Sequence, residues 1–180
     1  MNRNYARGDF RLLVGGRAQA EARLHGSEKY PDIRGTVRFY RSRNGVFVLT
    51  EVSGLPDGQS ECAGPIFGFH IHNGMECTGN PGDPFANTGG HYNPHNCLHP
   101  YHAGDMPPLF GAGGSAFSCF LTDRFTIPEI IGRTVVIHAM PDDFKTQPAG
   151  NSGMKIACGK ILSRQNARYA KGIQRGSEYR

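Results

Sequence analysis

An Asn-Gly pair at positions 44–45 divides residues 34–54 into two stretches in which apolar and polar residues alternate. Apolar residues recur at every second position on both sides, with Phe39 and Val46 close to the pair. A period of two is typical of a strand with one buried face, and Asn-Gly readily adopts the positive φ angles of a tight hairpin turn. The segment therefore predicts a β-hairpin.

Further segments have the same short, strand-like character: residues 18–24, 65–72, 115–123, 132–140 and 155–162. The best helical candidate is a connector at 126–131, which is only a turn or two long. Many short strands separated by turns are typical of an all-β protein. We therefore expect an antiparallel β-sandwich or barrel.

The charge of the chain is concentrated at one end. Residues 164–180 hold five basic residues and one acidic residue, and this tail accounts for most of the net charge of +5. We expect a solvated extension that binds no specific nucleic acid, because the segment has no dense basic cluster. No apolar stretch is long enough to span a bilayer. No secretory signal is recognisable either, which favours a cytoplasmic protein unless a signal has been removed.

Two long segments interrupt the strands. Residues 73–113 and 139–154 are rich in Gly, Pro, Asn and His. Structureless loops of this length are uncommon inside a domain and are either functional or disordered. Their low hydrophobicity favours disorder, whereas their histidines favour a loop folded around a metal ion.

The histidines form two candidate metal-binding sets. The first long loop contains His91, His99, His102 and Asp105. Three imidazoles and a carboxylate suit a closed tetrahedral zinc site.

A second set lies on the strands. His70 and His72 are two residues apart in GFHIHNG, so a strand would point both to one face. Together with His138 and one loop histidine they would form an all-nitrogen set, which suits Cu(II). His25 and His95 fit neither set, and we interpret them as structural.

Five motifs, in this order along the chain, resemble those of the copper/zinc superoxide dismutases: GFHIH (68–72), GGHYNP (89–94), HAGD (102–105), GRTVVIH (132–138) and GNSGMKIACG (150–159). The resemblance implies a domain at 18–163, with an N-terminal extension (1–17) and the tail (164–180). It implies a Greek-key β-sandwich or barrel of immunoglobulin-like type with two long functional loops, in a bacterial-type member whose zinc and electrostatic loops are shortened. Family members differ in the surface through which they dimerise, so a homodimer is compatible with the resemblance.

Carried over residue by residue, the resemblance implies copper on His70, His72, His91 and His138, and zinc on His91, His99, His102 and Asp105. His91 would bridge both metals and act in catalysis. Asp142 would join a copper histidine to a zinc histidine without touching either metal. Asp143, its neighbour, is expected to be solvated.

The resemblance also implies a disulfide between Cys77 and Cys158. Cys97 could pair with Cys62, and Cys119 is interpreted as a buried strand residue.

The family has an arginine where this chain has Lys155. Lysine keeps the positive charge that attracts a small anion but lacks the planar fork of arginine. We therefore predict a catalytic role for Lys155 in guiding superoxide, with activity retained at a reduced rate.

The function implied is disproportionation of superoxide to oxygen and hydrogen peroxide. Two alternatives are a copper-buffering or copper-delivery domain with little turnover, and a structural β-sandwich in which zinc only stabilises the fold. The complete copper set argues against a purely structural protein, because stabilisation would need only the four zinc ligands. Copper carriers commonly use softer Met or Cys ligands, so the all-imidazole set favours the enzyme.

Overall fold

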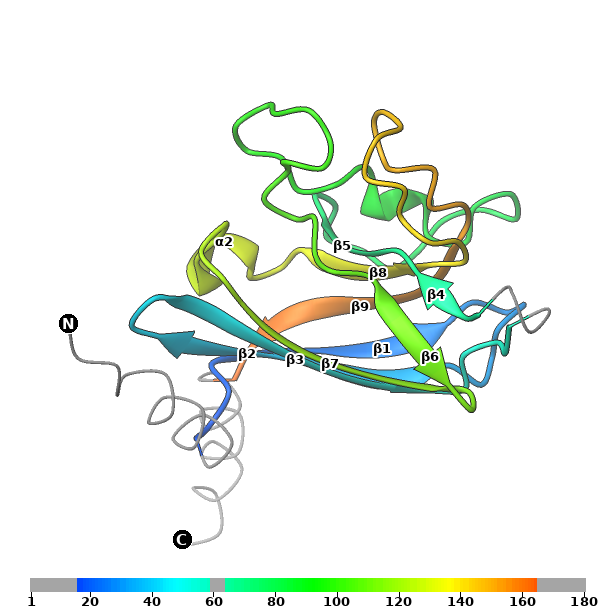
Figure 1. Ribbon diagram of the computed structural model, residues 1–180, viewed down its shortest axis with the longest axis horizontal. Helices are drawn as coiled ribbons and strands as arrows, with labels where there is room; N and C mark the ends of the chain where they lie inside the picture. Colours follow the sequence, from blue (N-terminus) through cyan, green and yellow to red (C-terminus); the bar gives the residue numbers. More distant parts are fainter. Residues whose placement is uncertain (1–15, 59–63, 165–180) are drawn as a thin grey trace, which may run out of the picture.

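A computed structural model describes residues 16–58 and 64–164 and shows, within them, nine antiparallel strands in a nearly closed barrel (Figure 1). In chain order these are β1 (Ala20–Gly26), β2 (Arg34–Ser42), β3 (Gly45–Ser53), β4 (Ile66–Phe67), β5 (Phe69–His72), β6 (Leu109–Ala112), β7 (Ser115–Thr122), β8 (Thr134–His138) and β9 (Lys155–Ser163). The strand order around the sheet is β4-β6-β7-β3-β2-β1-β9-β8-β5. The predicted all-β barrel is confirmed.

The predicted hairpin is formed by β2 and β3, which pair from Ser42 opposite Gly45 to Arg34 opposite Ser53. The predicted strand at 65–72 is divided at Gly68 into β4 and β5. The expected connector is the short helix α2 (Ile127–Ile130), whose first turn carries a capping box between Thr126 and Glu129.

The long loop at 73–113 was predicted to contain no strand, and this was wrong at its end. β6 pairs with β7 through Gly111 and Ala112, and Gly113 and Gly114 make the turn between the two strands. The segment has few β-branched residues and many glycines, so its composition indicates a loop. The pairing with β7 overrides that local preference. The same loop contains one short 3-10 helix, η1 (Ala86–Thr88).

The strands β5 and β8 are buried on both faces, and this places the polar residues that they carry. One face of each strand packs on the barrel core, which includes Phe69, Ile71 and Ile137. The long loops lie above these strands in Figure 1, on the side away from β1, β2 and β3. Side chains on that second face are therefore buried between the barrel and the loops.

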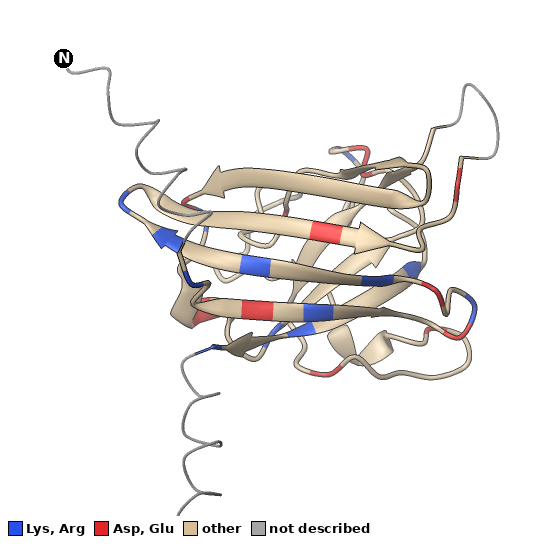
Figure 2. Ribbon diagram, turned by 90° about the horizontal axis from the view of Figure 1, so that it is seen from below, with Lys and Arg blue, Asp and Glu red and all other residues tan. Residues whose placement is uncertain are grey.

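Cys119 was expected to be buried, and this was wrong. Residues of β7 alternate across the sheet, so Ala116 and Phe120 contact the core while Cys119 lies on the outer face and is exposed. Figure 2 shows this outer face from below: β1 carries charges of both signs and β2 carries positive charges, whereas β7 carries none.

In the described part of the chain, no helix is long and apolar enough to cross a membrane.

Candidate metal centre

Two neighbouring strands place three of the histidines. His70 and His72 lie on β5, and His138 is the last residue of β8. The two strands pair in an antiparallel register in which His70 is opposite Val136. The backbone N–H of His138 then donates to the carbonyl of Gly68, just before β5. The three side chains are nearly inaccessible, with exposed fractions of 0%, 2% and 4%.

The first long loop is bound to the backbone of β5. The N–H of Ile71 donates to the carbonyl of Gly104 (2.9 Å), and the carbonyl of Ile71 accepts from the N–H of Tyr92 (2.8 Å). Any Cβ at position 104 would lie 2.2 Å from the Ile71 oxygen, so this close approach requires glycine. Isolated β-bridges continue the pairing and join His72 to His91 and His70 to Asp105.

The first group of side chains is purely histidine. One ring nitrogen from each member lies within 4.8 Å of the others in the set His70, His72, His91 and His138. Carbonyl oxygens of Gly89 and Gly153 contact the Nδ1 atoms of His72 and His138, at 2.8 and 3.1 Å. Their Nε2 atoms therefore face each other, 3.1 Å apart.

The second group shares His91 with the first. It consists of His91, His99, His102 and Asp105, whose donor atoms also lie within 4.8 Å of one another. Asp105 is at its centre: its carboxylate oxygens lie 2.7, 3.0 and 3.3 Å from the Nδ1 atoms of the three histidines. The backbone N–H of His102 also donates to this carboxylate (3.1 Å).

Asp142 connects the two groups. Its Oδ2 lies 2.7 Å from Nε2 of His70, and its Oδ1 lies 2.9 Å from Nε2 of His99. An ionised carboxylate can only accept, so each Nε2 carries a proton and each Nδ1 is left without one. Gly150 makes room for this contact, because a Cβ there would lie 2.1 Å from the Asp142 oxygen.

Within the described part of the chain, three buried ring nitrogens have no hydrogen-bond partner: His70 Nδ1, His91 Nε2 and His99 Nδ1. His99 Nδ1 is close to Asp105, but the geometry is not that of a hydrogen bond. A buried polar atom without a partner costs about 1–3 kcal/mol. Bound cations would satisfy all three nitrogens. The four-nitrogen group suits copper, and the group of three nitrogens and a carboxylate suits zinc.

The protonation states also suit metal binding. Burial lowers the pKa of His70 and His72, and it lowers the pKa of His138 to about 3. For Asp105, burial acts to raise the pKa, but the hydrogen bond from His91 and the nearby histidines outweigh it and the pKa is lowered. The imidazoles of His70, His72 and His138 are therefore neutral and the carboxylate of Asp105 is ionised at neutral pH, as metal ligands must be.

Two residues that support the site have no signal in the sequence. Arg124 lies just before α2, and its Nη1 donates to the carbonyls of Pro100 (2.9 Å), His102 and Asp105 (both 3.4 Å). Gln147, in the second long loop, accepts from the backbone N–H of His99 (2.9 Å) and donates to its carbonyl (2.8 Å). These contacts join distant segments, so no local motif marks them.

The remaining candidates lie around the two groups. Lys155 is on the strand next to β8, and its Nζ contacts Asp83 (2.7 Å) and the carbonyl of Phe85 (3.1 Å). Asp143 is exposed and accepts hydrogen bonds within its own turn. His25 and His95 are exposed and belong to neither group.

Among the described residues, Cys77 and Cys158 form a disulfide with their Cα atoms 5.6 Å apart. Cys97 is an exposed free thiol. Its suggested partner, Cys62, lies outside the described residues. Residues 165–180 of the basic tail also lie outside them.

Comparison with known proteins identifies relatives of this architecture. A family model described as copper/zinc superoxide dismutase (SODC) matches residues 33–161. A superoxide dismutase [Cu-Zn] of Deinococcus radiodurans is 39% identical over 147 residues, covering 71% of this chain and 76% of the relative. Superoxide dismutase [Cu-Zn] 2 of Aquifex aeolicus is 33% identical over 145 residues, covering 72% of this chain and 80% of the relative. The solved Cu/Zn superoxide dismutase from Brucella abortus has a TM-score of 0.65 at 25% identity, and the match covers 78% of this chain and 98% of that one.

Proposed function

The chain belongs to the copper/zinc superoxide dismutase family, and we propose that its two groups of side chains divide the metals between them. Copper is held by His70, His72, His91 and His138. Zinc is held by His91, His99, His102 and Asp105, so that His91 bridges both ions. The observation that carries this assignment is the set of buried ring nitrogens with no hydrogen-bond partner among residues 16–58 and 64–164, all of which belong to one group or the other.

The protein is a superoxide dismutase that uses copper and zinc. Bound copper would supply the one-electron chemistry by which two superoxide ions and two protons become oxygen and hydrogen peroxide. We propose that His91 takes up a proton at Nε2 and returns it during each cycle. Asp142 keeps the protons of His70 and His99 on Nε2, which leaves both Nδ1 atoms available to the metals.

His72→Ala tests the division of the ligands. Because His72 belongs to the copper group alone, the variant is expected to lose copper and superoxide consumption while it keeps one zinc per chain. His95→Ala is the matched control, since His95 is exposed and outside both groups. Loss of zinc with retention of copper would contradict the assignment. One copper and one zinc in an inactive parent protein would favour the copper-buffering alternative.

Lys155 is proposed to guide superoxide toward copper. Its backbone pairs with that of His138 across β8 and β9, which supports a position of Lys155 close to the proposed copper group. The charge of Lys155 is also one of the causes, after burial, that lower the pKa of His138. Lys155→Ala is expected to lower kcat/KM, and Lys155→Arg to raise it, since arginine offers two-point contact to a small oxyanion. Equal values for parent and both variants would contradict a guiding role.

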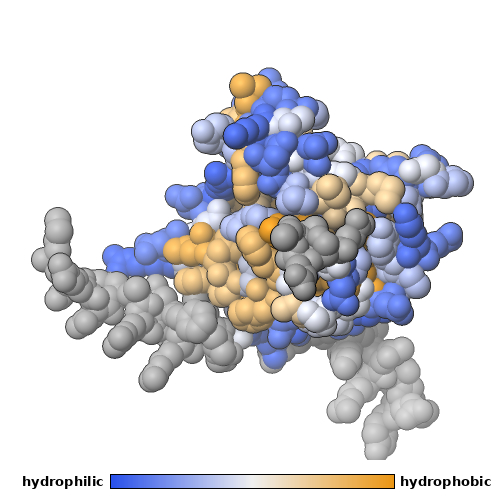
Figure 3. Space-filling view, turned by 45° about the vertical axis from the view of Figure 1, so that its right-hand side comes forward, coloured by the Kyte–Doolittle hydropathy of each residue, from blue (hydrophilic) through white to orange (hydrophobic). Residues whose placement is uncertain are grey.

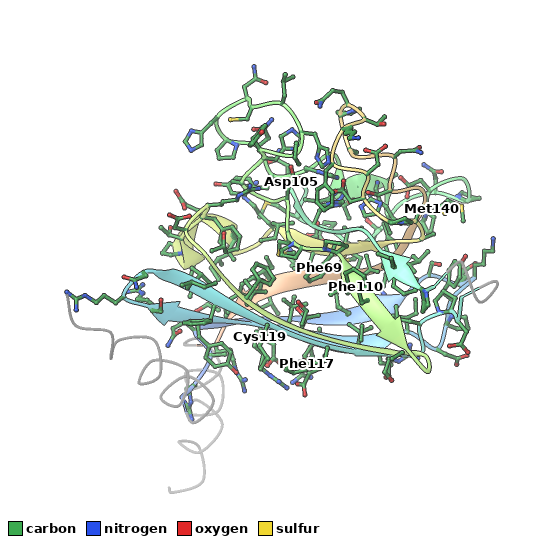
Figure 4. All side chains as sticks on the ribbon, viewed as in Figure 1. Phe69, Asp105, Phe110, Phe117, Cys119 and Met140 are labelled. Carbon is green, nitrogen blue, oxygen red and sulfur yellow. A yellow bond between two sulfur atoms is a disulfide. The ribbon has the colours of Figure 1, made fainter. Side chains whose placement is uncertain are left out.

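We also propose that the chain forms a homodimer through β6 and β7. The apolar residues Phe110, Phe117 and Leu121 are exposed by 67%, 68% and 44%. Figure 3 shows hydrophobic side chains gathered on the barrel wall below the hydrophilic loops, and Figure 4 places Phe117 and Cys119 well away from Asp105. A face without charge meets a second copy without like-charge repulsion. Phe117→Lys should shift sedimentation from dimer to monomer, and a monomeric parent would contradict the proposal.

A further inference from the structure

Lys155 does not present a free positive charge. Its Nζ lies 2.7 Å from Oδ2 of Asp83 and 3.1 Å from the carbonyl oxygen of Phe85. The lysine side chain is only 14% exposed, whereas that of Asp83 is 40% exposed. The ammonium group is thus held against the segment that precedes η1, and the carboxylate is the more accessible member of the ion pair.

The loop itself aims the carboxylate at Lys155. The backbone N–H of Phe85 donates to Oδ1 of Asp83 (3.0 Å), which leaves Oδ2 for the lysine. The backbone N–H of Asp83 donates to the side chain of Asn80 (3.1 Å), and its carbonyl accepts from the N–H of Ala86 (3.1 Å). Asp83 is therefore fixed at both backbone groups and at both side-chain oxygens.

The surroundings of the pair add no net charge. A groove of about 1060 Å³ runs between the segment after β1 and the loop before η1, and Lys155 and Asp83 line it together with Glu28, Lys29 and His25. The lining of the groove thus contains two lysines and two carboxylates, whose charges sum to zero. Burial acts to raise the pKa of Asp83, but the bonds from Lys155 and the Phe85 N–H outweigh it, and the pKa is lowered. The carboxylate is therefore ionised at neutral pH and the pair is neutral as a whole.

A neutral pair attracts a distant anion much less than a single cation does, because its two fields nearly cancel beyond the length of the pair. We infer that Asp83 is a positioning residue that holds the ammonium of Lys155 and cancels most of its attraction for superoxide, a role that rests on the proposed function of Lys155. Asp83 thereby limits the rate at which anions reach the copper group.

The expected size of the effect follows from Coulomb's law. A unit charge about 10 Å from the anion, in water, changes the local concentration of a monovalent anion about twofold. Asp83→Asn keeps an oxygen for the Phe85 N–H but removes the negative charge. We therefore expect kcat/KM to rise about twofold at low ionic strength. The gain should shrink to about 1.2-fold near 0.15 M salt, where the screening length is about 8 Å.

The experiment uses the protein loaded with both metals. Superoxide consumption is measured from low salt to 0.15 M for the parent, Asp83→Asn and Asp83→Glu. Glu51→Gln is the matched control: it removes the same charge from an ion pair with Arg38 (2.5 Å), at an exposed position on the outer face of β3. We expect a gain for Asp83→Asn only, and parental values for Asp83→Glu and Glu51→Gln.

A second readout does not depend on turnover. Azide is a monovalent anion that binds Cu(II), so its affinity can be titrated through the copper absorption band. Azide should bind about twofold tighter to Asp83→Asn at low salt. Asp83→Asn/Lys155→Ala replaces a neutral pair by another neutral pair, so it should have the salt dependence of the parent.

Two results would overturn the inference. An azide affinity that is equal in the parent and Asp83→Asn would show that Asp83 does not attenuate the charge. A lower affinity would show that Asp83 instead holds Lys155 in its productive position. If the fully loaded parent consumed no superoxide, the proposed function would fail, while the azide titration would still decide the role of Asp83.

Discussion

Asp142→Asn is the sharpest test of how the two groups of ligands are connected. Asp142 uses both oxygens: Oδ2 accepts from His70, and Oδ1 accepts from His99 and from the backbone N–H of Phe144 (2.7 Å). Asparagine has one acceptor oxygen and one donor NH₂ group. The oxygen can replace Oδ1, but the NH₂ group then faces the N–H of His70. To avoid two opposed donors, His70 must move its proton to Nδ1, the atom that faces the copper group.

The magnitude follows from the role of such supporting residues. Loss of a partner that orients a ligand costs 10- to 100-fold in metal affinity, which is about 1.4–2.7 kcal/mol. We expect a loss of this size for one metal, and copper is the metal affected if the amide oxygen stays on the side of His99. Competition with a chromophoric chelator at fixed pH measures both affinities.

Asp143→Asn is the control for this experiment. Asp143 is the next residue, but it is exposed and its carboxylate accepts from the residues of its own turn. We expect both metal affinities of this variant to match those of the parent. Copper and zinc affinities of Asp142→Asn that both stayed within twofold of the parental values would refute the reasoning.

Further predictions concern stability and pH. Thr50 is fully buried and its hydroxyl has no hydrogen-bond partner among the residues that the structure describes, so Thr50→Val should stabilise the metal-free protein by about 1 kcal/mol in urea unfolding; a lower midpoint would contradict this. The disulfide joins residues 81 positions apart, and Cys77→Ala/Cys158→Ala should destabilise the protein by about 4 kcal/mol; a loss below 1 kcal/mol in the same assay would contradict it. Because the pKa of Asp83 is lowered, its pair with Lys155 is complete above the ordinary value of the carboxyl group and is lost only as the pH falls through the lowered one. The difference in azide affinity between the parent and Asp83→Asn should therefore be constant from pH 8 to pH 5, and a difference that shrank toward pH 5 would count against the pairing.

Much of the fold follows from local patterns in the chain. The alternation on both sides of residues 44–45 indicates the hairpin, and the two-residue spacing of His70 and His72 puts both on one face of β5. That face is buried rather than solvated, because the long loops cover it. The expectation that the loops are folded rather than disordered rests on their histidines, and the backbone pairing of Ile71 with Gly104 shows how the fold is held.

The contacts that local patterns do not reveal are those between distant segments. Asp83 and Lys155 are 72 positions apart and meet because the segment before η1 lies against the start of β9. Arg124 reaches the carbonyls of the first long loop from the connector before α2. Asp83 and Arg124 belong to no motif, since a charge in a loop is compatible with many partners. Only the packing of the loops on the barrel selects one.

The sharing of His91 by the two groups has a thermodynamic consequence. An ion in one group fixes the ring of His91 and removes freedom that the other ion would otherwise have to remove. Occupancy of the two sites is then coupled, and the coupling is reciprocal: zinc changes the affinity for copper by the same factor as copper changes the affinity for zinc. Titrations of this protein with either metal therefore need the occupancy of the other to be stated.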